Sequence, residues 1–114
     1  MLKNLKMFLL VPVVVADTVA YKFIGEISEL QKNDEYNKDN FVKLCKEMCI
    51  ILALQFTLLE IGWVRRQVVY ARLFSQLSGN GISKQVAYNT VKLFKDGVRQ
   101  AEPQMASFKI PSGS

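Results

Sequence analysis

The chain lacks histidine altogether and contains only two cysteines. Without histidine it cannot by itself form a His-metal site, a bis-histidine haem site, or a Ser-His or Cys-His catalytic dyad. Cys45 and Cys49 are four residues apart on an expected helix. Two thiols with no further cysteine or histidine make a poor zinc or cluster site, and a disulfide between them does not fit helical geometry. We expect free, buried thiols that pack as small apolar side chains, with a bridge to another chain left open.

Motifs that carry recognisable enzyme or nucleotide chemistry are also missing. The segment 78–81, Ser-Gly-Asn-Gly, has neither the Walker spacing nor a Gly-x-Gly-x-x-Gly pattern. The sequence has no nucleophile elbow, no paired-carboxylate motif and no internal repeat. It also has no basic strand interleaved with aromatic residues of the kind that stacks bases. The sequence therefore predicts a protein that is not an enzyme and binds no nucleic acid, metal or cofactor, with a bound phospholipid left open.

What the chain does contain is a strong concentration of apolar residues in two segments, 7–24 and 48–64. Residues 48–59 form an uncharged run of twelve, which continues to Trp63 and then to Arg65 and Arg66. An apolar run that ends on a tryptophan and two arginines is typical of a helix leaving a bilayer. A soluble chain of this size more often spreads such residues as stripes through every helix. The distribution favours a membrane protein.

The charges are divided into blocks along the chain, although the net charge is only +5. The first sixteen residues carry two lysines and no acid, residues 17–64 carry eight acids and five lysines, and residues 65–114 carry eight bases and two acids. Basic ends around an acidic loop at 25–40 fit a transmembrane hairpin by the positive-inside rule. Both termini would then face the matrix of a mitochondrion or the cytoplasm of a bacterium. The alternative is a basic patch on a soluble protein.

The first segment, 7–24, allows more than one interpretation. It could span the membrane with Pro12 as a tolerated kink, although the small residues at 14–16 also resemble a secretory signal cleaved before Asp17. Asp17 inside such a span would cost about 2.5–3.5 kcal/mol. Asp17 could instead cap an amphipathic helix, form a salt bridge with Lys22, or act as a buried functional carboxylate.

The second segment predicts one long helix over 41–77, capped by Asp39 or Asn40 and interrupted by nothing stronger than Gly62. Such a helix would be roughly 55 Å long. It would exceed the hydrocarbon core of about 30 Å and project into water. Its amphipathic extension would need another surface to pack against, which points to a protein partner.

The positions of individual side chains along this predicted helix suggest what they do. Gln55 would donate hydrogen bonds between membrane helices. Glu60 would lie near the membrane boundary as an interfacial or salt-bridged carboxylate, with a proton or ion pathway as the alternative. The residues expected at the membrane interface are Trp63, Arg65 and Arg66. The candidates for packing against a partner are Gln55, Val68, Phe74, Phe94 and Val98.

The C-terminal third predicts an amphipathic helix over 83–101, capped by Ser83 and ended before Pro103. Its apolar stripe includes Phe94 and Val98, and its polar side is basic. Such a helix can lie on an anionic membrane surface or dock on a partner. Residues 102–114 are expected to form an extended tail, ordered only where another chain holds it.

Together these features predict an all-α membrane hairpin that acts as a non-catalytic accessory subunit. The expected setting is a multi-subunit, energy-transducing complex of the respiratory or ATP synthase type. The location would be the mitochondrial inner membrane, or alternatively a bacterial inner membrane, with other subunits and membrane lipid as partners. A second hypothesis is a soluble or peripheral helical adaptor in which 48–64 is the central buried helix. A third is a membrane proton or ion pathway component that uses Asp17 or Glu60.

Overall fold

The computed structural model describes the backbone of residues 2–108 and the side chains of residues 10–108. The described part consists of helices and turns and contains no strand, so the predicted all-α class is confirmed. Four α-helices are followed by a 3-10 helix. They are α1 (Leu2–Lys32), α2 (Lys38–Leu58), α3 (Trp63–Gly79), α4 (Lys84–Ala101) and η1 (Glu102–Phe108).

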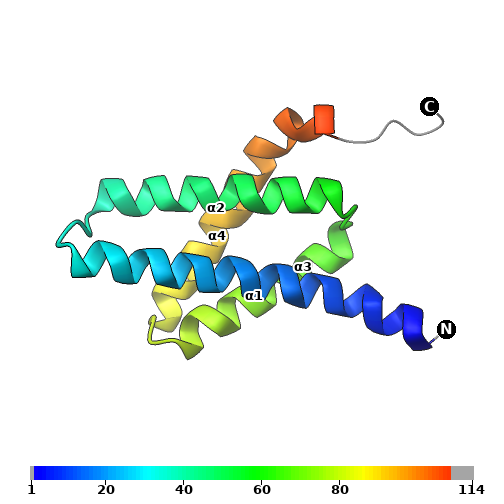
Figure 1. Cartoon of the computed structure of the whole chain (residues 1–114), viewed down its shortest axis with the longest axis horizontal. Helices are drawn as coiled ribbons and strands as arrows, with labels where there is room; N and C mark the ends of the chain where they lie inside the picture. The colour runs from blue at the N-terminus through cyan, green and yellow to red at the C-terminus, as the bar shows by residue number, and fades with distance from the viewer. Residues whose placement is uncertain (1, 109–114) are drawn as a thin grey trace.

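Successive helices run back and forth (Figure 1). The long helices α1 and α2 form an antiparallel hairpin, α3 folds back to pack along α1, and α4 crosses the hairpin steeply. Helix α4 packs against both α2 and α3, and η1 continues from it onto α2. The arrangement brings all four helices around one core.

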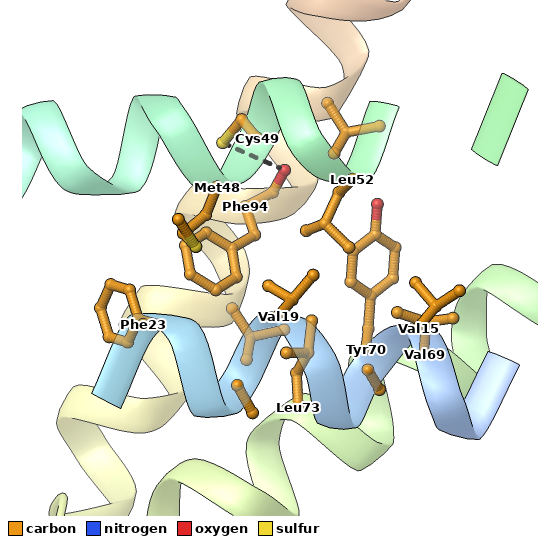
Figure 2. Packing of buried hydrophobic residues seen from close by; sticks show 14 of the residues in the cluster. Val15, Val19, Phe23, Met48, Cys49, Leu52, Val69, Tyr70, Leu73 and Phe94 are labelled. Carbon is orange, nitrogen blue, oxygen red and sulfur yellow. Dashed lines mark hydrogen bonds between the residues drawn. The ribbon is translucent and has the colours of Figure 1, made fainter. Parts of the chain in front are cut away.

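The core is built from the apolar faces of all four helices (Figure 2). Phe23 of α1 lies edge-on to Phe94 of α4 with their ring centroids 5.4 Å apart, an arrangement favoured by aromatic rings. Met48 and Leu52 of α2 are completely buried in the same cluster. The uncharged run 48–59 therefore packs largely against other helices of the chain.

This packing overturns the membrane prediction. None of the helices within residues 2–108 combines the length and the apolar character that crossing a membrane requires. The finding contradicts the predicted transmembrane hairpin, with spans at 7–24 and 41–77, and the predicted inner-membrane location. Hydrophobic runs that pack against a bilayer and against neighbouring helices have the same composition, which is why the sequence pattern misled us.

The predicted single helix over 41–77 is also wrong, because the chain reverses at residues 59–62. Glu60 adopts a left-handed conformation with φ of 51°, and Ile61 is buried behind it with only 1% of its surface exposed. Gly62 is extended and precedes the first residue of α3. Arg65 donates a hydrogen bond to the carbonyl of Glu60 at 2.8 Å, which closes the turn. The reversal lets α3 cover α1 instead of projecting away.

The first three helices end in the same way. A residue in the left-handed region is followed by a residue whose N–H bonds back to a carbonyl five residues earlier, as in the Schellman motif. The left-handed residues are Asp34, Glu60 and Gly81. Asp34 and Glu60 are not glycine, the residue that usually adopts this conformation. The turn after α2 therefore cannot be predicted from a glycine in the sequence.

The predicted cap of α4 is confirmed, whereas the predicted cap of α2 and the predicted extended tail are wrong. Ser83 accepts a hydrogen bond from the N–H of Val86 and caps α4, as the sequence predicts. Asn37, rather than Asp39 or Asn40, caps α2. The tail expected to be extended is a 3-10 helix over Glu102–Phe108, with Met105 buried against the core, while residues 109–114 lie outside the described residues.

Candidate functional site

A groove of about 560 Å³ lies between α3 and α4 on the surface of the bundle. Such a volume falls within the range of ligand-binding clefts. Tyr70 and Val91, which are buried in the core, contribute its floor, and the half-buried Phe74 extends it. Ala71 is exposed and carries too small a side chain to fill the space beside Phe74. The remaining lining residues are Gln67, Tyr88, Lys92, Lys95, Asp96 and Arg99.

The charged groups of the groove all belong to α4. Lys92, Lys95 and Arg99 follow one another at steps of three and four residues, so they share one face of the helix. Asp96 is the single acid among the lining residues. Across the groove, α3 offers only uncharged side chains to this lining. The groove therefore has an apolar floor and one basic edge.

Tyr70 joins the floor to the basic edge. The Lys95 ammonium lies 5.3 Å from the centre of the Tyr70 ring, within the range of a cation–π contact. Burial raises the pKa of the Tyr70 hydroxyl to about 12, so it stays neutral at physiological pH. Tyr88 of α4 adds an aromatic side chain with 60% of its surface exposed. The groove thus presents aromatic surface without adding negative charge.

Two lining residues, Tyr70 and Tyr88, were not singled out from the sequence. Tyr88 carried a usable signal, because it is an aromatic residue on the basic side of an amphipathic helix. Of the predicted packing residues, Phe74 lines the groove. Val68 is half-buried on the same helix.

Two other predicted packing residues are closed to a partner. Phe94 is completely buried and Val98 is 2% exposed, because the apolar stripe of α4 faces the core. The prediction that they contact another protein is therefore wrong. Gln55 is half-buried on α2, and its side-chain oxygen has no hydrogen-bond partner in the described part of the chain.

Asp17 lies in the middle of α1 and accepts hydrogen bonds from α3, so it is not a helix cap. Arg72 Nε lies 2.8 Å from Asp17 Oδ1, Arg72 Nη2 lies 3.2 Å from Oδ2, and Gln76 Nε2 lies 3.0 Å from Oδ1. The hydrogen bond from Arg72 lowers the pKa of the Asp17 carboxyl, against an opposing effect of burial. Lys22, which we expected to pair with Asp17, lies 3.8 Å from Glu26 instead. Asp17 therefore links two helices.

Glu60 and the two predicted interface arginines gather at the α2–α3 turn. Arg66 donates to the carbonyl of Ile61 at 2.9 Å, forms an ion pair with Glu102 and lies over the ring of Phe56. Glu60 and Arg66 line a second cavity of about 410 Å³. The arginines are thus used to close the turn and to hold η1.

Trp63 stands apart from these contacts with 75% of its surface exposed. It shares the α2–α3 turn with other exposed apolar side chains, Leu58, Leu59 and Val64. Exposed apolar clusters of this kind mark contact surfaces more often than single exposed residues do.

The two thiols are free and buried on α2, as the sequence predicts. Burial raises the pKa of Cys45 to about 12 and that of Cys49 to about 11, so both stay protonated. A protonated, buried thiol is a poor nucleophile and a poor metal ligand. Within the described residues, no three His, Cys, Asp or Glu side chains gather in a way that would hold a metal ion.

No protein-family model matches this chain, and no match was found either to a curated protein or to a solved structure. The groove and its chemistry are therefore the basis for a functional proposal.

Proposed function

We propose that this chain is a non-enzymatic helical adaptor that binds another protein through the α3–α4 groove. The observation that carries the proposal is the combination of an apolar floor with a one-sided basic edge. Protein interfaces characteristically join an apolar, aromatic centre to a polar rim. Tyrosine and arginine, which both line this groove, are the residue types enriched at such interfaces.

The chemistry of the titratable groups supports a binding role over a catalytic one. The thiols are protonated and buried, and the Asp17 carboxylate is engaged by Arg72 and Gln76. A nucleophile or general base needs a partner that activates it and access to a substrate. The groove itself contributes one carboxylate, Asp96, beside three cations. These side chains are suited to binding an anionic partner.

Position-specific photo-crosslinking tests the adaptor function. A photoreactive phenylalanine analogue would replace Tyr88 at the groove, and in a matched variant it would replace Tyr36, an exposed tyrosine at the α1–α2 turn. In cells that produce the chain, we expect a defined protein to be crosslinked from position 88 and not from position 36. Equal crosslinking from both positions, or none from position 88, would contradict the proposal.

A further inference from the structure

We infer that the α3–α4 groove binds the apolar face of an acidic amphipathic helix supplied by the partner. This inference rests on the adaptor function and specifies what kind of segment occupies the groove.

The recognition mode follows from the secondary structure. A peptide that binds by adding a strand needs an exposed sheet edge, but residues 2–108 form helices and turns and offer no such edge. The backbone N–H and C=O groups of α3 and α4 are largely engaged within their own helices. Recognition must therefore come from side chains, as it does when an amphipathic helix lies in an apolar groove.

The charges select an acidic partner and fix its orientation around its own axis. Lys92, Lys95 and Arg99 all lie along the α4 edge, whereas Gln67 and Ala71 on the α3 side are uncharged. A bound helix that inserts apolar side chains above Tyr70 and Phe74 can therefore meet cations along only one flank. We expect its acidic residues on that flank and neutral residues on the other.

The spacing of the cations gives the pattern of acids. Lys92 and Arg99 are seven residues apart, which is about 10.5 Å along a helix at 1.5 Å per residue. A partner helix running alongside α4 matches this span with acids at i, i+3 or i+4, and i+7. Asp96 interrupts the cations and disfavours an unbroken acidic run. The expected motif is thus two turns of helix with an apolar stripe and an adjacent acidic stripe.

A single-stranded nucleic acid is the competing anionic occupant. Such ligands are held by a groove that is positive along the path of the backbone, with aromatic rings on which bases stack. Here the cations occupy one edge only, an acid lies among them, and the floor is formed partly by Ala71 and Val91. These features favour an amphipathic helix.

The test uses the full chain and three labelled synthetic peptides of equal length. One peptide carries leucines at i, i+3, i+4 and i+7 with a flanking glutamate stripe, the second has the same composition with the stripes scrambled, and the third replaces glutamate with lysine. Fluorescence anisotropy should show the patterned acidic peptide binding at least about tenfold more tightly than either control, since steering and complementarity depend on charge.

Two sets of substitutions test the two halves of the groove. The triple variant Lys92→Glu, Lys95→Glu, Arg99→Glu should lose the acidic peptide and gain the lysine peptide. Ala71→Trp should fill the floor and weaken the acidic peptide while leaving the cations in place. Circular dichroism would establish that both variants keep the helical content of the parent chain.

The outcomes separate this inference from the adaptor function. Equal binding of the patterned and scrambled peptides would overturn the inference. It would also be overturned if an oligothymidylate bound the parent chain more tightly than the peptide does and did not bind the triple variant. Crosslinking from position 88 combined with no peptide binding would overturn the helical occupant and leave the adaptor function standing. Failure of both experiments would overturn the adaptor function as well.

Discussion

Helix α4 has two sides that contrast sharply. Toward α2 the contact is closed, because Gly97 allows the two helices to approach until its Cα faces the side chain of Cys49. A Cβ on Gly97 would overlap the sulfur of Cys49 and lie 2.9 Å from its Cβ. Toward α3 the contact is open and leaves the groove of about 560 Å³.

The difference shows how residue size assigns roles to the two sides of one helix. A glycine and a thiol create close packing, and the Cys49 thiol also lies 3.7 Å from the carbonyls of Leu93 and Phe94. On the open side, the small side chain of Ala71 leaves the half-buried Phe74 partly uncovered. Burial of apolar surface stabilises a fold by about 25 cal/mol per Å². Apolar surface that stays exposed in the groove therefore does not contribute to stability, whereas the packed surface between α4 and α2 does.

The largest expected effect lies on the closed side, at Phe94. Phe94→Ala removes a completely buried ring and its edge-on contact with Phe23. We expect the free energy of unfolding to fall by about 3–5 kcal/mol, as for other buried phenylalanines. Urea denaturation measures it, and Leu93→Ala is the matched control because Leu93 is 46% exposed on the same helix. A loss at Phe94 no greater than that at Leu93 would refute the packing described here.

Gly97→Ala is a smaller and more specific test of the close approach. The added methyl group should force α4 away from Cys49 and cost about 1–3 kcal/mol, the usual cost of overpacking. In a Cys49→Ala background the cost should shrink, because the sulfur is gone while the Cβ remains in contact. Denaturation of the two single variants and the double variant measures this coupling. Strict additivity would show that the two residues do not meet.

Glu60→Gly tests the turn at residues 59–62, which folds α3 back onto α1. Glycine adopts the left-handed conformation of residue 60 without steric cost, so we expect a gain of about 0.5–1 kcal/mol in unfolding free energy. Glu29→Gly, within the helical part of α1, should instead lose about 1 kcal/mol. Thermal denaturation of both variants compares the signs. Destabilisation by both would argue against the reversal at residues 59–62.

The smallest expected effect concerns the polar contact that holds α3 on α1. The pKa of Asp17 is lowered in the folded chain, so its contribution is present above the unfolded pKa near 3.8 and is lost as the pH falls through the lowered value. The difference in melting temperature between the parent chain and Asp17→Asn should be constant at neutral pH and vanish in strong acid. Both partners are partly exposed, so we expect a small difference. A difference that grows on acidification would contradict the pairing.

Sequence reasoning worked where a local signal dominates. The cap at Ser83, the periodic apolar stripe through Phe94 and the pair of cysteines at helical spacing all point to features that the structure contains. It failed where the signal is shared between environments. The stripe was recognised, yet Phe94 and Val98 were assigned to a partner, because periodicity identifies an apolar face without identifying what covers it.

The groove could be anticipated only in part. The basic side of α4 is visible in the sequence, but much of the apolar floor belongs to α3, which folds back onto α1 at the turn of residues 59–62. The left-handed conformation of Glu60 cannot be predicted from its residue type, since most such positions are occupied by glycine. Without that turn, α3 would continue away from α2 instead of packing along α1.

By itself, the sequence determined the helical class, the basic face of α4 and the lack of histidine-dependent chemistry, because these depend on composition and on periods of three to four residues. Only the tertiary structure decided whether the apolar runs face lipid or one another, and where the chain reverses. It also decided which side of α4 closes and which stays open. Those outcomes depend on distances between helices, and such distances arise from residues far apart in the chain.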